Sequence, residues 1–155
     1  MKNILKLLFF AGIIVLAAFS CDDEKDNPSD YKPIEIKKIT DFGCEDCVIR
    51  IKTEYMEDDT SYIIYSESDF NKYVEYYAGT TIPAIDYQKY FLIIGMKRYL
   101  HGAEIIEEKA KENNEEIIYT ITLLINDYHT PITLFYHVFL EKPIDEKNIR
   151  IELIY

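Results

Sequence analysis

Residues 103–125, AEIIEEKAKENNEEIIYTITLLI, decide the fold class because they contain two strand-like arms joined by a tight turn. Asn113 and Asn114 stand between the arms, and asparagine tolerates the left-handed backbone conformations of such a turn. Thr120 and Thr122 mark the polar face of the second arm. Its other face is apolar and carries Ile117, Tyr119, Ile121, Leu123 and Ile125. The segment therefore predicts an antiparallel hairpin with one buried face.

Further strands are predicted on both sides of this hairpin. Residues 47–55 alternate between apolar and charged side chains, which is the period of a half-buried strand, and SYIIYS at 61–66 forms a second short strand. YFLIIGM, from Tyr90, is apolar throughout, and we expect it at the centre of the sheet. ITLFYHVFL from Ile132 and IRIELIY from Ile149 follow, separated by a loop that contains Pro143.

One segment has the period of a helix instead. In SESDFNKYVEYYAG, residues 66–79, an apolar stripe at helical spacing predicts a helix that packs its stripe into the core. Ser66 or Ser68 can cap the first turn, Asp69 suits the positive end of the helix dipole, and Gly79 suits the C-terminal end. The stripe consists of Phe70, Tyr73, Val74 and Tyr77. We therefore expect a single small α+β domain, a mainly antiparallel β-sheet with one amphipathic helix packed on it.

The N-terminus has the layout of a secretory signal peptide. Lys2 and Lys6 precede an apolar run at residues 7–19, which is too short to span a membrane as a helix. The small residues before Cys21 resemble the lipobox of bacterial lipoproteins, in which that cysteine becomes the acylated first residue of the mature chain. The alternative is an ordinary signal peptide with a chance cysteine. Three segments follow: a lipoprotein signal peptide at 1–20, a flexible acidic tether at 21–33, and the domain at 34–155.

The tether, CDDEKDNPSDYKP, is too polar to bury apolar area. Asp22 resembles an inner-membrane retention signal of some bacteria, whereas the extended acidic cluster resembles an export signal for the outer surface. We favour the second, hence a lipid anchor in the outer membrane of a bacterial cell envelope, with the domain facing either the cell surface or the periplasm. Removal of Lys2 and Lys6 takes the net charge from −11 to −13. This charge disfavours nucleic-acid binding and suits solubility or a basic protein partner.

Residues 62–140 resemble a known family. The helix segment SDFNKYV, the stretch IPAIDYQKYFLIIGM with Asp86 and Tyr87, and the hairpin are similar to the PrcB C-terminal domain family and to small lipoprotein domains of unknown function. The glycine-rich stretch of that family is replaced here by MKRYLHG. The resemblance implies a noncatalytic partner that binds and stabilises a secreted protease complex.

The cysteines of GCEDC, Cys44 and Cys47, have the C-x-x-C spacing. A zinc site needs more ligands, and the three histidines are scattered. Glu45 and Asp46 between the sulfurs disfavour a reactive thiolate. In an oxidising envelope compartment we expect a local disulfide, with free or metal-bound thiols as the alternative.

No motif indicates an enzyme. The sequence has no G-x-S-x-G elbow, no H-E-x-x-H and no phosphate-binding glycine loop. Asp127 and His129 in NDYHTP are better explained by a polar loop between strands. The 14 tyrosines suggest sugar stacking, but many are predicted at core positions and the chain has no Trp. We expect no catalytic residues, no metal and no cofactor.

The remaining feature is GMKRYLHGAE, the densest basic patch of the domain. One interpretation is a solvated turn whose cations offset nearby carboxylates. The other is a loop that binds an as yet unidentified protein partner, since Arg and Tyr often anchor interfaces. The candidate residues are Lys97, Arg98, Tyr99, Leu100 and His101. The sequence thus predicts a protein-binding module that modulates a secreted or surface complex, or an immunity-type protein that neutralises an envelope-targeted toxin.

Overall fold

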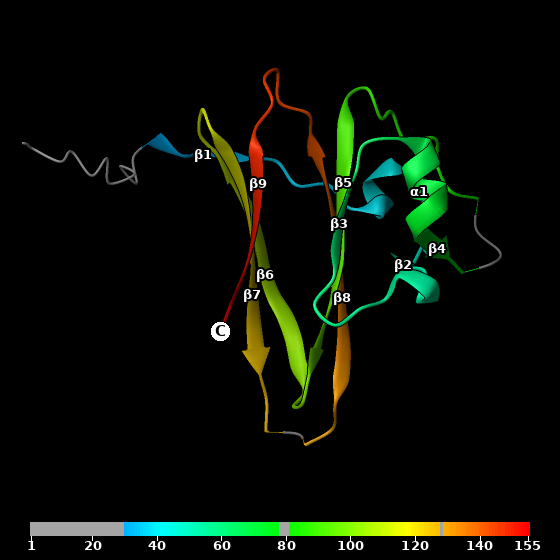
Figure 1. The fold of residues 1–155 in the computed structure, drawn as a ribbon, viewed down its shortest axis with the longest axis vertical. Coiled ribbons are helices and arrows are strands. Elements are labelled where there is room, and N and C mark those ends of the chain that lie inside the picture. The colour runs from blue at the N-terminus through cyan, green and yellow to red at the C-terminus, as the bar shows by residue number, and fades with distance from the viewer. Residues whose placement is uncertain (1–29, 78–80, 128) are drawn as a thin grey trace, which may run out of the picture.

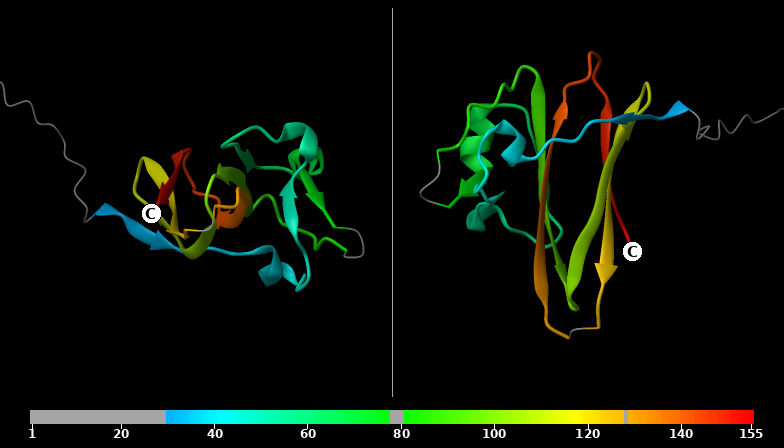
Figure 2. Two further views of the ribbon diagram at one scale, coloured as in Figure 1. Left: turned by 90° about the horizontal axis from the view of Figure 1, so that it is seen from below. Right: turned by 180° about the vertical axis from the view of Figure 1, so that it is seen from behind.

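Two β-sheets and a layer that contains a helix stack side by side in a computed structural model of the chain (Figures 1 and 2). The structure describes residues 30–77, 81–127 and 129–155. In these residues one α-helix accompanies strands β1 to β9, which form sheets of four, three and two strands. The predicted α+β class is confirmed. The expected single sheet is replaced by three separate ones.

The outer sheet has the strand order β1-β6-β7-β9. Its members are β1 (Lys32–Ile34), β6 (Ala103–Glu112), β7 (Glu116–Ile125) and β9 (Asn148–Ile154). The predicted hairpin is confirmed as β6 and β7, and Asn113 Oδ1 accepts hydrogen bonds from the backbone N–H groups of Glu115 and Glu116 in its turn. The pairing of β7 with β9 is parallel, which differs from the antiparallel prediction. It is parallel because the intervening strand β8 (Ile132–Glu141) returns through the other sheet.

The middle sheet has the order β3-β5-β8, from β3 (Ser61–Ile64), β5 (Tyr90–Tyr99) and β8 (Ile132–Glu141). The prediction that the YFLIIGM segment is a central strand is confirmed. This sheet lies between the other two layers, so both faces of β5 are buried. Leu92 and Ile94 face the helical layer, while Phe91 and Ile93 face the outer sheet. A strand buried on both faces has no reason to alternate, which explains the continuous apolar run.

The third layer contains the 3₁₀ turns η2 (Ile39–Phe42) and η3 (Thr53–Tyr55), helix α1 (Glu67–Tyr73), and the paired strands β2 (Ile49–Ile51) and β4 (Val74–Tyr76). Ser66 caps α1 by accepting a 3.1 Å hydrogen bond from the Asp69 N–H. The helix ends earlier than predicted because Val74 starts β4, which pairs with β2. The predicted strand at 47–55 is correspondingly reduced to β2, and a 3₁₀ turn follows it.

Two apolar cores lie on the two faces of the middle sheet. The first, beneath α1, includes Ile51, Ile64, Phe70, Val74, Leu92, Ile94, Met96 and Phe139. The second, between the sheets, includes Phe91, Ile93, Ile117, Tyr119, Ile121, Leu123, Tyr136, Val138 and Leu140. The predicted core face of the second hairpin arm lies in the second core except for Ile125, which is exposed because it stands at the end of β7. The helix stripe contributes Phe70 and Val74 to the first core, with Tyr73 packed against it, whereas Tyr77, beyond the end of β4, is exposed.

The predictions for the N-terminal segment lie mostly outside the described residues. These are the signal peptide at 1–20, the acylated Cys21 and most of the tether; the expected helix end at Gly79 also lies outside them. Lys32 and Pro33, placed in the tether by the sequence, already pair with Glu112 and Lys111 of β6. In the part of the chain that the structure describes, no helix has both the length and the apolar character needed to cross a membrane.

Candidate functional site

The five residues predicted to bind a partner do not lie together in one loop. Lys97, Arg98 and Tyr99 are the last residues of β5 and pair with β8, whereas Leu100 and His101 belong to the turn that leads into β6. The turn lies at one end of the sandwich, at the bottom of Figure 1. We refer to this end, formed by the β5–β6 turn and the β7–β8 loop, as the free end.

The two cations of the basic patch are paired within the chain. Lys97 Nζ lies 3.2 Å from Asp59 Oδ2, and Arg98 Nη1 lies 2.8 Å from Asp58 Oδ1. Both carboxylates come from the segment just before β3, which the sequence does not connect to the patch. The Arg98 and Asp58 side chains are 60% and 71% exposed, so their attraction is screened by water. The structure therefore shows cations offsetting nearby carboxylates, in line with the first interpretation of this patch.

Tyr99 faces the interior. Its ring packs against the second core and makes an edge contact with Tyr155, with 6.2 Å between the ring centroids. Burial raises the pKa of the Tyr99 phenol. This side chain therefore ties the end of β5 to the C-terminal end of the outer sheet and does not project from the surface.

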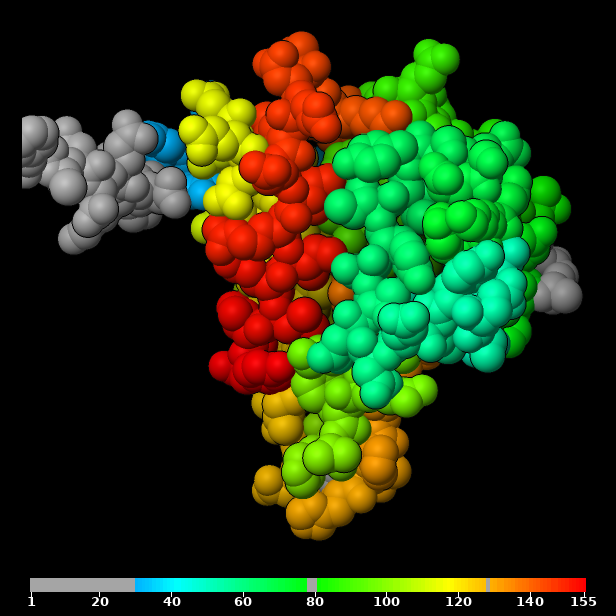
Figure 3. Space-filling model, in the orientation of Figure 1, coloured from blue at the N-terminus to red at the C-terminus, as the bar shows by residue number. Residues whose placement is uncertain are grey.

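Leu100 and His101 are the exposed members of the set. Leu100 is 78% exposed, and the His101 ring lies 5.3 Å from the His129 ring, between centroids. The Asn126 N–H donates a 2.9 Å hydrogen bond to the Gly102 carbonyl, which holds the β7–β8 loop against the β5–β6 turn. Asn126 and His129 of the NDYHTP segment, far from the β5–β6 turn in the sequence, therefore lie against this turn at the free end. Figure 3 shows both segments protruding from the body of the molecule.

Large exposed apolar side chains occur on the elements that reach this end. We call them the free-end surface: Leu100, Ile106, Leu124, Ile125, Ile154 and Tyr155, all of them exposed. Singly exposed apolar residues are ordinary, but a group of them on neighbouring elements is typical of an interaction site. The sequence pointed only to Leu100. The other five residues lie in or beside predicted strands, and the alternation of those strands does not distinguish an exposed apolar residue from a buried one.

Three of these residues are neighbours across the outer sheet. Thr122 of β7 pairs directly with Ile154 of β9, so Leu124 lies diagonally next to Ile154 on the solvent face. The β6–β7 register shifts between Ile105 and Glu107, and the extra residue, Ile106, is exposed while Ile105 packs on the core. The bulge therefore turns an additional apolar side chain outward beside Leu124.

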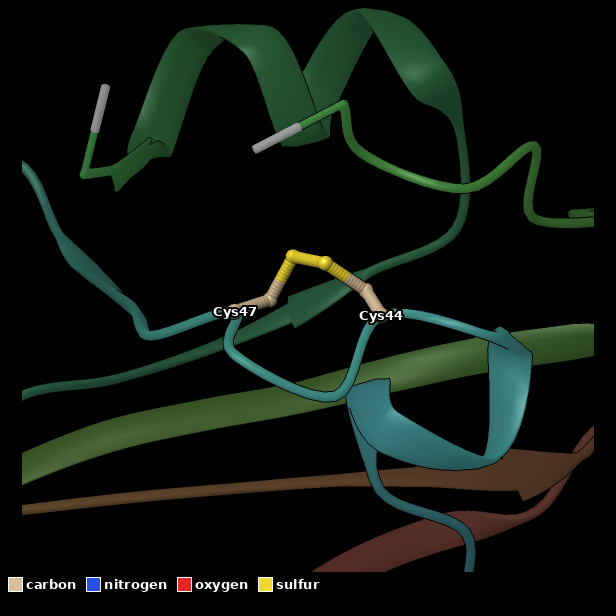
Figure 4. Close-up of a disulfide and its surroundings, with 2 residues drawn as sticks. All are labelled: Cys44 and Cys47. Atoms are coloured by element: carbon tan, nitrogen blue, oxygen red, sulfur yellow. A yellow bond between two sulfur atoms is a disulfide. The ribbon is translucent and has the colours of Figure 1, made fainter. Parts of the chain in front are cut away.

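Cys44 and Cys47 form a disulfide that belongs to the first core (Figure 4). The two Cα atoms are 5.4 Å apart, and both side chains are buried in the segment between η2 and β2, facing α1. The predicted local disulfide is confirmed. The bond closes a short loop within the third layer, and its buried sulfurs pack into the first core under the helix.

A partly buried polar cluster lies beside the second core, away from the free end. Tyr119 donates its hydroxyl to Glu108 Oε1, and Lys38 Nζ donates to the same oxygen and to the His137 carbonyl, each at 2.6 Å. The His137 Nε2 atom is buried and has no hydrogen-bond partner among the described residues. Burial, and to a smaller extent the charge of Lys38, lower the pKa of His137 to about 4, and the charge of Glu108 opposes this shift. His137 is therefore neutral at physiological pH.

Asp86 and Tyr87, which carry part of the family resemblance, have structural roles. The Asp86 side chain accepts a 2.9 Å hydrogen bond from the Gln88 N–H, and the Asp86 carbonyl accepts from Tyr90, closing the turn that starts β5. The Tyr87 ring packs on the first core near Phe70. Burial raises the pKa of the Tyr87 phenol.

A hollow of about 890 Å³ lies at the opposite end of the molecule. Six of its charged side chains form ion pairs: Lys37 with Glu35 at 2.8 Å, Lys89 with Glu141 at 3.3 Å, and Lys147 with Glu112 at 2.6 Å. In the described part of the chain no three His, Cys, Asp or Glu side chains are grouped as metal ligands would be.

Comparisons with known proteins give no relatives. No family model, no curated protein and no solved structure matches the chain. The resemblance to the PrcB C-terminal domain family stays a prediction.

Proposed function

We propose that the chain is a lipid-anchored protein of the bacterial cell envelope whose domain is a noncatalytic protein-binding module. The observation that carries the proposal is the free-end surface, in which Ile106, Leu124 and Ile154 are exposed apolar neighbours from three strands of the outer sheet. Covering such side chains with a partner removes apolar area from water, at about 25 cal/mol per Å² before the costs of association. The partner we propose is a secreted or surface protein that the module stabilises or modulates.

The position of β1 suits an anchored module. β1 pairs with residues 110–112 at the far end of β6, whereas the free-end surface begins near residue 103 at the other end of this strand. A strand rises about 3.3 Å per residue, so the two ends are separated by roughly 20 Å or more. A tether that enters through β1 would therefore hold the free-end surface pointing away from the membrane.

Capture from an envelope extract tests the binding surface, with the full chain as bait. Leu124→Asp and Leu100→Asp should each lose the partner, because a charge would be buried in the interface. Ile144→Asp is the matched control: Ile144 is fully exposed, at 103%, in the β8–β9 loop at the opposite end. A partner retained by both free-end variants, or lost equally with Ile144→Asp, would contradict the proposal. A captured toxin would favour the immunity-type alternative.

Labelling tests the anchor separately. Growth with radioactive palmitate should label the wild-type chain in the membrane fraction, and Cys21→Ser should abolish the label. An equally labelled Cys21→Ser variant would exclude Cys21 as the acylated residue.

A further inference from the structure

Strand β9 leaves one edge unpaired. It is the last strand of the outer sheet, and no other strand of the described residues pairs with its second edge. Figure 3 shows the C-terminal strand, in red, at the molecular surface along most of its length. An exposed edge is a template for a further strand, because its backbone N–H and C=O groups point outward without ladder partners.

Three residues of β9 point their backbone N–H and C=O groups away from β7. The Asn148 N–H donates a 2.9 Å hydrogen bond to the Glu115 carbonyl, so Asn148 and every second residue after it point their backbone groups toward β7. Ile149, Ile151 and Leu153 therefore point theirs to the open edge. Their side chains are half-buried against the second core, which leaves apolar area at this edge for a neighbouring strand to cover.

The sequence of β9, NIRIELI, is self-complementary about Ile151. Two copies of the strand in antiparallel order about this residue place Ile149 opposite Leu153 and Arg150 opposite Glu152. Arg150 and Glu152 point to the same face of the sheet, as their mutual ion pair shows. Arg150 of each copy would therefore lie opposite Glu152 of the other copy, and the two opposite charges would attract each other.

We propose that the chain dimerises by antiparallel pairing of β9 with β9 of a second copy, with the two-fold axis at Ile151. In this register Ile151 pairs with its own copy, and Ile149 pairs with Leu153. Each of these pairs uses outward-pointing groups and exchanges two backbone hydrogen bonds. The pairing is isologous, so it closes at two copies and joins the two outer sheets into one.

Neighbouring registers are disfavoured by charge. A two-fold axis at Arg150 also pairs the residues whose backbone N–H and C=O groups face the open edge. It sets two Arg150 side chains directly opposite each other, however. A two-fold axis at Glu152 sets two Glu152 carboxylates directly opposite each other. Like charges in directly opposite positions are destabilising, so the axis at Ile151 is selected.

Apolar area beside β9 supports the same surface. Ile63 and Tyr65, at the edge of the middle sheet, are 36% and 46% exposed. Ile63 pairs with Ile93, a residue of the second core, so its side chain faces the outer sheet. An added strand at β9 would extend the outer sheet and its apolar face.

Charge reversal tests the register on the full chain in a non-ionic detergent by sedimentation velocity. The wild type should show concentration-dependent dimers. Glu152→Arg and Arg150→Glu should each weaken self-association about tenfold or more, because each sets like charges opposite each other. Mixed together, the two variants should dimerise as the wild type does, since the charges are then complementary. A monomeric wild type, or a mixture as weak as the single variants, would overturn the proposal.

Cross-linking provides a test that leaves the charges unchanged. In the proposed register, Ile151→Cys brings two cysteines to a Cα separation of about 5.5 Å, within the range of a disulfide. Leu153→Cys is the matched control on the same face, because its copies are four residues out of register and cannot be bridged. We expect an oxidised dimer with Ile151→Cys only. No cross-link at residue 151, or equal cross-linking at 153, would contradict the pairing. Neither test involves Leu100 or Leu124, so this dimer and the proposed partner surface can fail independently.

Discussion

The ring of Tyr136 lies over Gly95, its direct partner across strands β5 and β8. A β-carbon built on Gly95 would overlap the ring carbons and the hydroxyl of Tyr136. Tyr136 itself is buried in the second core. The absence of a side chain at residue 95 therefore makes the space into which this ring packs.

Gly95→Ala should destabilise the fold by about 1 to 3 kcal/mol, the usual cost of overpacking a core. The reason is that Tyr136 would have to leave its position in the second core. Chemical denaturation of Gly95→Ala, Tyr136→Leu and the double variant measures the effect. The double variant should be more stable than the sum of the single losses predicts, because the smaller leucine leaves room for the methyl group. Additive losses would show that the ring and the glycine do not share this space.

Loss of Glu108 should be more destabilising than loss of the Tyr119 hydroxyl. Tyr119→Phe removes one hydrogen bond to a carboxylate, at a cost of about 1.5 to 3 kcal/mol. Glu108→Ala leaves both the buried Tyr119 hydroxyl and the Lys38 ammonium without this partner, so the free energy of unfolding should fall further. Glu107→Ala is the neighbouring control, since its exposed pair with Lys109 contributes at most about 1 kcal/mol. Equal losses of stability at residues 107 and 108 would contradict a stabilising role for the partly buried cluster.

His137 should make stability fall as the pH decreases below about 6.5. The pKa of this histidine is about 4 in the folded chain, compared with about 6.5 when unfolded. Between these values the unfolded chain binds a proton that the native chain does not, so acid favours unfolding. The free energy of unfolding should fall by at most about 3 kcal/mol through this group, and the decrease levels off below about pH 4.

Denaturant titrations between pH 7 and pH 5 measure this contribution. His137→Gln should flatten the dependence in this window, whereas His129→Gln, at an exposed position in the β7–β8 loop, should retain the wild-type slope. An unchanged slope in His137→Gln would show that other groups cause the pH dependence.

Removal of the disulfide should lower stability by about 2 kcal/mol, because a loop this short constrains the unfolded chain only modestly. The double variant Cys44→Ala/Cys47→Ala should have a thermal midpoint near that of the wild type in reducing agent. It should be somewhat lower, because the variant also loses the packing of two buried sulfurs. The double variant should not respond to reductant. A wild type whose midpoint is the same with and without reductant would mean that the disulfide does not stabilise the third layer.

The sequence correctly predicts the features that depend on neighbours along the chain. The β6–β7 hairpin follows from its alternation and from Asn113, and the start of α1 follows from the cap at Ser66. Alternation also placed Ile117 and Tyr119 correctly in a core. It could not place the free-end surface, because Leu124 and Ile154 become neighbours only when β7 and β9 pair.

Local patterns also gave the wrong length for α1. Tyr73 and Val74 have helical spacing, but Val74 pairs with Ile51 of β2. The residues around the helix contain no sign of this pairing, because β2 lies far from them in the sequence. Tertiary contacts therefore override the helical period at this point.

By itself, the sequence determined the α+β class, the hairpin and the Cys44–Cys47 disulfide, because each depends on residues within a few positions of one another. Only the tertiary structure decided that two cores flank the middle sheet, that β9 runs parallel to β7, and that Asp58 and Asp59 pair with the basic patch. These features are contacts between segments distant along the chain. Their energies depend on how the layers pack, and no local pattern of side chains encodes them.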